Sequence, residues 1–144
     1  NFRLDEIRSA LGLSQMKRLN KSNDLRKKAS DYYTSQLSDV KGIITPKNSK
    51  SNENSFHLYI IRITKDFPLT RDVLFKKLLD NGIRTSVHYK PLNQFTLFKK
   101  MAKSYDKLKI SNMLYDEILS LPMYPTIRKS DQKYVIKSIK NGII

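Results

Sequence analysis

Cysteine is absent from this 144-residue sequence. Its absence excludes disulfide bonds and thiolate metal sites, and it is typical of a reducing compartment. The sequence also lacks a long apolar segment. The longest, residues 58–61, is far shorter than the roughly 18 residues of a membrane span, and no stretch resembles a signal peptide. We therefore expect a cytoplasmic protein with no membrane partner.

The motifs of self-sufficient enzymes are also missing. The chain has no glycine-rich phosphate loop, no HExxH pair and no nucleophile elbow. With only His57 and His88, and no cysteine, a metal site would depend on carboxylates, and these do not cluster. We expect neither a metal site nor an independent catalytic set within this chain.

Acidic residues are scarce, with 13 Asp and Glu against 28 Lys and Arg, which gives a net charge of +15. Such a charge raises the hypothesis of a basic nucleic-acid-binding domain. However, the 20 lysines outnumber the 8 arginines and are scattered along the chain. Nucleic-acid-binding proteins tend to concentrate arginine and interleave it with stacking aromatics. We favour a solvated, lysine-rich surface and expect no specific nucleic acid partner.

Hydrophobic periodicity predicts helices through residues 4–37, with a second helix starting within 20–24. The core face of that second helix would hold Leu25, Ala29, Tyr32, Tyr33 and Leu37. A short edge strand over 43–46 and a polar loop over 47–55 follow. Residues 56–63 are apolar on both faces, which is typical of a central strand.

The second half of the chain alternates in the same way. Residues 70–81 read as a helix with Val73, Leu74, Leu78 and Leu79 inward and Gly82 as its left-handed cap. Further elements are expected in this order: a strand over 83–89, a loop containing Phe95 and Phe98, a helix over 111–120, and a last helix starting at Ser130. The order predicts an α+β fold, with helices packed on a three-stranded, mainly antiparallel sheet that two helices precede.

Two groups of residues carry possible ligand chemistry. His88 and Tyr89 end the strand over 83–89, where polar groups on a rigid scaffold often contact ligands. The alternative is that His88 bonds a neighbouring carbonyl and Tyr89 belongs to the core. His57, within the central strand, is more typical of an interior histidine than of a ligand.

Asn1 and Arg3 form the second group, just before the first helix. An amide and a guanidinium there can hold a phosphate or a carboxylate by hydrogen bonds. The alternative is an ordinary helix entry with a solvated arginine. The chain begins at Asn1 rather than at a methionine, so we expect it to be the carboxy-terminal piece of a longer protein.

Several motifs in order and spacing resemble one family. The matching segments are residues 1–6, 10–13, 15–19, 57–59, 82–83, 88–92, 119–125, 131–132 and 135–136. The first of these, Asn1-Phe2-Arg3, and the later His88-Tyr89-Lys90-Pro91-Leu92 and Leu121-Pro122-Met123-Tyr124-Pro125, are similar to the DegT/DnrJ/StrS aminotransferases. The similarity covers essentially the whole chain.

The resemblance implies the small carboxy-terminal domain of a fold-type-I aminotransferase. Residues 1–40 would then be connecting helices and residues 41–144 the small domain, with the amino-terminal cofactor domain absent. Family members use pyridoxal 5'-phosphate (PLP) on a lysine Schiff base, and the protein positions this cofactor. They transfer an amino group, usually from glutamate, to a keto group of a nucleotide-linked sugar for polysaccharide or glycan precursors. They assemble as homodimers with shared active sites.

The resemblance also implies roles for individual residues. Asn1 matches the asparagine that reaches the cofactor phosphate in the partner subunit, and Arg3 an arginine near the same site. His88 and Tyr89 match the pair that approaches the sugar nucleotide. The chain departs from the family at Asn93, where members often have histidine. The Schiff-base lysine belongs to the absent portion, so this chain has no catalytic residue, and we expect the fragment alone to be inactive.

Three alternatives remain open at this point. Some relatives use PLP to dehydrate a sugar and replace the lysine. The basic nucleic-acid-binding domain is the second alternative, motivated by the charge. The third is a non-catalytic remnant that only dimerises.

Overall fold

A three-stranded antiparallel sheet lies at the centre of the protein. The structure, a computed structural model, describes residues 3–47, 54–101 and 108–143. The strands β1 (Ile43–Ile44), β2 (Tyr59–Ile63) and β3 (Ile118–Leu121) are arranged in the order β1-β2-β3. Ile43 pairs with Ile63, and Tyr59 pairs with Leu121. The predicted α+β fold with a three-stranded antiparallel sheet is confirmed.

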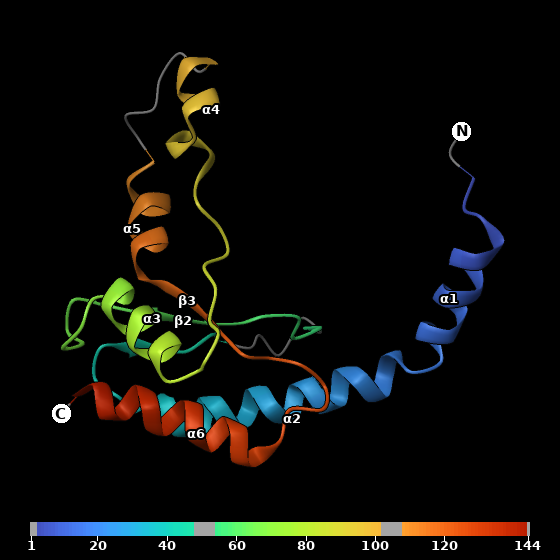
Figure 1. Ribbon diagram of the computed structural model, residues 1–144, viewed down its shortest axis with the longest axis horizontal. Coiled ribbons are helices and arrows are strands. Elements are labelled where there is room, and N and C mark those ends of the chain that lie inside the picture. Colours follow the sequence, from blue (N-terminus) through green and yellow to red (C-terminus); the bar gives the residue numbers. More distant parts are fainter. Residues whose placement is uncertain (1–2, 48–53, 102–107, 144) are drawn as a thin grey trace.

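Three helices pack around this sheet and close the core. They are α2 (Leu19–Leu37), α3 (Arg71–Asp80) and α6 (Lys129–Lys140). Figure 1 shows α2 and α6 side by side, and α3 contacts both β3 and α6. Their fully buried side chains include Leu37, Leu74, Leu78 and Ile139, which share one cluster with Tyr59, Ile61 and Leu119 of the sheet.

Polar contacts fix how α2 lies in the core. The Tyr33 ring stacks on Tyr59, with the ring centroids 5.1 Å apart. The Tyr33 hydroxyl donates to the Pro122 carbonyl at 3.2 Å, and the Gln132 amide donates to the Ala29 carbonyl at 2.9 Å. Because each of these buried polar groups finds a partner, the tyrosine and the glutamine cost the core little. Ala29, Tyr33 and Leu37 are buried as predicted.

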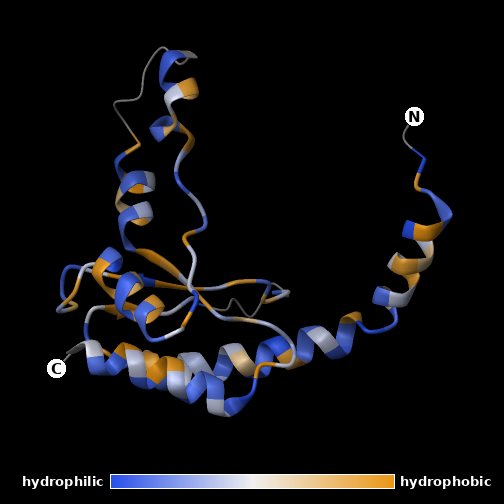
Figure 2. Cartoon of the chain, viewed as in Figure 1, coloured by the Kyte–Doolittle hydropathy of each residue, from blue (hydrophilic) through white to orange (hydrophobic). Residues whose placement is uncertain are grey.

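Two parts of the chain extend away from this core. Helix α1 (Glu6–Met16) lies beyond the first turns of α2 and has no buried residue. On another side, the short helix η1 (Leu92–Gln94), α4 (Thr96–Met101) and α5 (Lys109–Glu117) rise from the sheet (Figure 1). Figure 2 shows that both extensions carry apolar positions among polar ones. After α6, the short helix η2 (Asn141–Ile143) ends the described chain and contacts α6.

The predicted identity of the third strand is wrong. Residues 83–89 form no strand, and only Ser86 makes an isolated antiparallel bridge, to Ser120. The third strand is β3, which the sequence assigned to the end of a helix over 111–120. Helix α5 stops at Glu117 because Ile118 adopts an extended backbone, with φ −73° and ψ 138°. The short apolar run before Pro122 therefore pairs with β2 rather than continuing the helix.

The central strand is shorter than predicted. It begins at Tyr59, and Phe56 has a φ of +50°, which an extended strand cannot accommodate. The Phe56 N–H donates to the Asn54 side-chain oxygen at 2.8 Å, so a local turn replaces strand pairing there. His57 is consequently exposed and is not the interior histidine that was expected.

The helix boundaries are closer to expectation. The Thr70 hydroxyl accepts from the Val73 N–H, and Gly82 has a φ of +74°, so α3 begins and ends as predicted. However, Val73 and Leu79 are 46% and 50% exposed, because α3 meets the core along only the Leu74 and Leu78 row. Helix α6 starts at Lys129 with Arg128 as its N-cap, not at Ser130. Helix α4 lies where a loop was expected.

Candidate functional site

The candidate site is built on the bridge between the 83–89 segment and β3. The Ser86 N–H donates to the Ser120 carbonyl at 3.2 Å, and the Ser120 N–H donates to the Ser86 carbonyl at 2.8 Å. This pair of bonds fixes the backbone of an otherwise unpaired segment against the sheet. Two residues further on, His88 lies on the same side of the extended chain as Ser86.

The His88 ring is anchored on β3 by a side-chain hydrogen bond. Its Nδ1 lies 2.8 Å from the Ser120 hydroxyl oxygen. Ser120 is only 4% exposed, whereas His88 is half-buried. The alternative that His88 bonds a carbonyl is therefore wrong. A half-buried ring held at one nitrogen is the arrangement expected of a positioned ligand contact.

Tyr89, which follows His88 in the chain, extends into solvent. Its side chain is 75% exposed, so the alternative that it belongs to the core is wrong as well. The peptide bond joining it to His88 is cis. The two rings meet edge to face with centroids 4.8 Å apart. An exposed phenol beside an anchored imidazole offers one donor-acceptor group and one ring nitrogen to a ligand.

A cluster of side-chain amides includes residues that follow this pair along the chain, and no sequence motif predicted that these amides would meet. The side-chain N–H groups of Asn93 and Gln94 both donate to the Asn112 side-chain oxygen, at 3.2 and 3.0 Å. This shared acceptor holds η1 against α5. The Asn93 side-chain oxygen is buried and has no partner among the described residues, and the same is true of the Thr85 hydroxyl oxygen.

The other predicted pair lies apart from this site. Asn1 falls outside the described residues. Arg3 is exposed and precedes Asp5, which caps α1 by accepting from the Arg8 N–H at 2.8 Å. Figure 1 shows α1, which Arg3 precedes by a few residues, well away from β3. The structure therefore does not bring Arg3 together with His88 and Tyr89.

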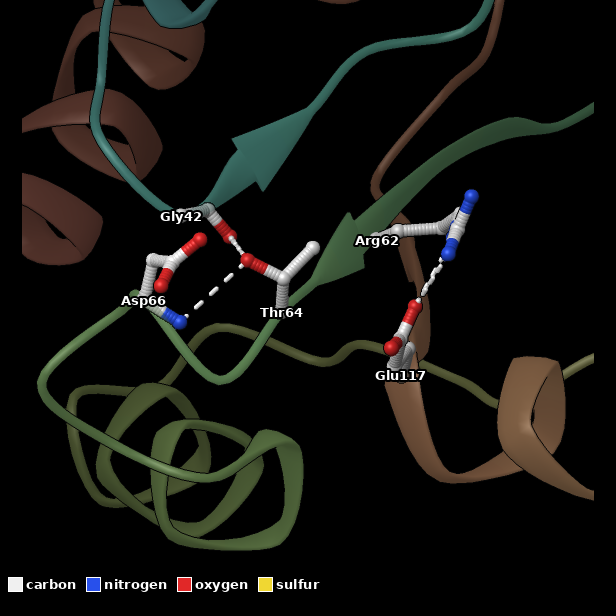
Figure 3. Close-up of polar contacts among 5 residues, drawn as sticks. All are labelled: Gly42, Arg62, Thr64, Asp66 and Glu117. Carbon is white, nitrogen blue, oxygen red and sulfur yellow. Dashed lines mark hydrogen bonds and ion pairs between the residues drawn. The ribbon is translucent and has the colours of Figure 1, made fainter.

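The strongly perturbed ionisable groups belong to the core rather than to the site. Burial raises the pKa of Tyr59 to about 12, and burial likewise raises the pKa of Tyr33. Figure 3 shows a partly buried ion pair, in which Arg62 of β2 meets Glu117 at the end of α5, 2.6 Å apart. We assign these groups to stability and not to ligand binding.

Within the described parts of the chain, no group of three or more His, Asp or Glu residues can hold a metal ion. No helix within 3–47, 54–101 or 108–143 is long and apolar enough to cross a membrane.

A sequence model of one protein family matches nearly the whole chain, including the segments that form this site. The sequence model of the DegT/DnrJ/EryC1/StrS aminotransferase family matches residues 1–140. The chain belongs to this family. The match runs from the segment before α1 through β3 and the site to the end of α6, so it includes every element described above except η2.

Individual members of the DegT/DnrJ/EryC1/StrS family are similar over nearly the whole chain. The UDP-4-amino-4,6-dideoxy-N-acetyl-beta-L-altrosamine transaminase of Campylobacter jejuni is 31% identical over 135 residues, which cover 94% of this chain and 36% of that protein. The structure of Helicobacter pylori PseC, an aminotransferase involved in pseudoaminic acid biosynthesis, matches with a TM-score of 0.89 and 29% identity. That match covers 99% of this chain and 38% of PseC.

A third similar structure is that of a PLP form. The putative sugar aminotransferase Spr1654 of Streptococcus pneumoniae, in its PLP form, matches with a TM-score of 0.87 and 25% identity. The match covers 97% of this chain and 36% of Spr1654. The chain thus spans little more than a third of the length of these relatives, and its fold is that of a portion of a fold-type-I aminotransferase.

Of the two residues predicted to contact the cofactor, the structure of this chain describes only Arg3. The Arg3 guanidinium has the chemistry to hold a phosphate, but Arg3 is exposed in this chain. His88 and Tyr89 lie on a different segment, beside β3. No chemical step on the cofactor can therefore be assigned to these residues.

Proposed function

We propose that the full-length protein is a PLP-dependent aminotransferase that acts on a nucleotide-linked sugar. It transfers an amino group from glutamate to a keto group of that sugar, in the cytoplasm, for a cell-surface polysaccharide or glycan precursor. The observation that supports this most is the family match over residues 1–140. The transaminase activity named for the Campylobacter jejuni relative and the PLP form of Spr1654 agree with it.

Within this proposal, His88 and Tyr89 contact the sugar nucleotide. The supporting geometry is the ring of His88 anchored on β3 and the exposed phenol beside it. Asn1 and Arg3 contribute to cofactor binding in a homodimer whose active sites are shared, which agrees with the position of α1 away from β3 (Figure 1). Residues 1–40 are connecting helices, and residues 41–144 form the small domain.

Cofactor binding by the full-length protein is the direct test. We expect it to bind PLP, to show the visible absorbance of the bound cofactor, and to lose that absorbance when glutamate is added. Subsequent addition of a keto sugar nucleotide should restore it. If the full-length protein never binds PLP, the proposal is wrong. Cofactor binding without any response to glutamate would favour the sugar dehydratase instead.

Substitutions test the substrate-side residues. In the full-length enzyme, His88→Gln and Tyr89→Phe should each lower kcat/KM for the sugar nucleotide by roughly tenfold, because each removes about one hydrogen bond. The glutamate half-reaction should stay unchanged. His57→Gln is the matched control, since His57 is exposed and is the only other histidine of the 144 residues. Equal effects of all three substitutions would contradict these roles.

The 144-residue chain alone should be inactive. It contains the anchored His88 and Tyr89, but it corresponds to little more than a third of the length of its relatives. We expect no PLP absorbance from it at cofactor concentrations that saturate the full-length protein. Glutamate-dependent amination by this chain alone would overturn the proposal that its activity depends on the rest of the enzyme.

A further inference from the structure

Ser120 is a polar residue in an apolar strand. It lies between Leu119 and Leu121, which are both buried in the core, and it is itself 4% exposed. A buried hydroxyl costs free energy unless it is hydrogen-bonded. The only side-chain partner of its hydroxyl among the described residues is Nδ1 of His88, at 2.8 Å. The hydrogen bond to His88, rather than packing with Leu119 and Leu121, therefore explains why a serine occupies this position of β3.

The backbone of Ser120 also bonds the 83–89 segment, which carries His88. Its N–H and carbonyl form both bonds of the bridge to Ser86, at 2.8 and 3.2 Å. Ser120 thus fixes the position of the 83–89 segment against the sheet through its backbone. It also holds the His88 ring through its side chain. Removing the hydroxyl leaves the backbone bridge intact, so the two effects can be separated by experiment.

The direction of the side-chain bond decides what His88 offers to a ligand. If the hydroxyl hydrogen points elsewhere, it is buried without an acceptor among the described residues. If it points at Nδ1, the hydroxyl hydrogen and the Nδ1 lone pair satisfy each other, and the neutral ring carries its hydrogen on Nε2. Nε2 has no hydrogen-bond partner in the described parts of the chain. The second arrangement leaves His88 as a donor at Nε2.

We propose that Ser120 is the positioning residue of His88: its hydroxyl donates to Nδ1, orients the ring, and so presents an Nε2–H donor to an oxygen of the sugar nucleotide. The acceptor on the substrate is a hydroxyl or phosphate oxygen, because these are the acceptors such a ligand carries. The substrate part of this proposal rests on the proposed function. The Ser120–His88 bond itself does not, and it is tested separately.

The first experiment uses nitrogen NMR on the 144-residue chain with labelled histidine. The chain has two histidines, so two sets of ring signals are expected, and exposed His57 serves as the internal reference. At a pH where both rings are neutral, His88 should be a single Nε2–H tautomer. Ser120→Ala should convert it to a mixture of tautomers, whereas Ser120→Thr, which keeps the hydroxyl, should retain the single form.

Ser86→Ala is the matched control for this experiment. The Ser86 side chain is exposed, and only its backbone pairs with Ser120. It should leave the His88 tautomer unchanged. The amide spectrum of each variant shows whether the sheet is retained. If wild-type His88 carries its hydrogen on Nδ1, or if Ser120→Ala leaves its tautomer as in wild type, the positioning role is wrong.

The second experiment uses the full-length enzyme. Ser120→Ala should raise KM for the sugar nucleotide by about 3- to 10-fold and leave the glutamate half-reaction unchanged, with Ser120→Thr restoring most of the loss. A changed tautomer with unchanged sugar kinetics would show that Ser120 holds His88 but that His88 does not serve the substrate. Failure of the full-length protein to bind PLP would refute the proposed function alone, since the NMR result does not depend on it.

Discussion

Helices α1 and α6 have similar apolar patterns and opposite surroundings. In α6, Val135, Ile136 and Ile139 are buried against α2, α3 and the sheet. In α1, no residue is buried, and Ile7 and Leu13 are 83% and 67% exposed. Both helices show helical spacing of apolar residues (Figure 2). The pattern therefore predicts which side of a helix is apolar, but not whether this chain covers it.

The difference indicates which parts of the molecule stand alone. Burying a leucine or isoleucine side chain stabilises a fold by about 1.5–3 kcal/mol, and α1 obtains none of this from the described core. Helix α1 therefore contributes little to the stability of the described core.

The largest expected effect compares one leucine from each region. Leu78→Ala should lower the free energy of unfolding of the 144-residue chain by about 2–5 kcal/mol, because Leu78 is fully buried. Leu11→Ala should change it by less than about 0.5 kcal/mol, since Leu11 is 60% exposed in α1. Urea unfolding followed by circular dichroism measures both. Similar losses for the two variants would mean that α1 packs on the core in solution.

Two glycines extend the comparison to the backbone. Gly42 has a φ of +82°, and a Cβ there would lie 2.1 Å from the Phe67 nitrogen. Figure 3 shows its place in the turn, where its carbonyl accepts from the Thr64 hydroxyl at 3.2 Å. Gly42→Ala should cost about 2 kcal/mol or more, from left-handed strain and the backbone clash.

Gly12 of α1 should respond in the opposite direction. It lies in a helix, and a Cβ there meets nothing within 4 Å. Gly12→Ala should raise the helix content of the chain, because alanine favours a helix by about 1 kcal/mol over glycine. The core unfolding transition should stay where it was. A shift of that transition by Gly12→Ala would contradict the independence of α1 from the core.

Local signals explain how much of the fold the sequence predicts. The Thr70 cap and Gly82 act within a few residues of their helix, so the bounds of α3 follow from neighbouring residues. The core face of α2 follows from its periodicity in the same way. The third strand does not, because a strand is defined by pairing with distant residues. Residues 83–89 alternate well, but only the backbone of Ser86 pairs with β3.

The residues of the candidate site also differ in whether the local sequence predicts them. His88 and Tyr89 can be found from a motif at the end of an extended segment, although their roles stay predictions. Ser120 could not be found in this way, because its contact with His88 spans 32 residues. Its one local signal is a hydroxyl within the apolar run Leu119–Leu121. The Asn93 cluster was missed because Asn112 joins it only in three dimensions.

Alkaline pH should weaken the core. Burial raises the pKa of Tyr59 to about 12 from an ordinary value of 10.0, so the folded state resists its ionisation. The neutral phenol is favoured in the folded state, and its stability contribution is fully present below pH 10 and lost as pH rises toward 12. We expect unfolding free energy to fall by on the order of 2 kcal/mol across that window.

Tyr59→Phe separates this residue from other alkaline effects. It removes the ionisable group together with the hydrogen bond to Thr34, which is 2.8 Å long. The variant should be less stable at neutral pH by about 1 kcal/mol but should lose less stability between pH 10 and pH 12. A wild-type pH profile retained in full by the variant would assign the alkaline loss to another group, with Tyr33 as the next candidate.

The smallest expected effect concerns the junction between the core and the α4–α5 extension. Arg62 and Glu117 pair across this junction, with side chains 32% and 18% exposed. The Lys27–Asp31 pair on α2 is 58% and 51% exposed. Double-mutant cycles with Arg62→Met and Glu117→Gln should give a coupling of about 1 kcal/mol, against about 0.3–0.5 kcal/mol for the α2 pair. Since salt screens exposed charges more strongly, high salt should weaken the α2 coupling by the larger fraction. Equal couplings would mean that the Arg62–Glu117 pair is as solvated as the pair on the helix surface.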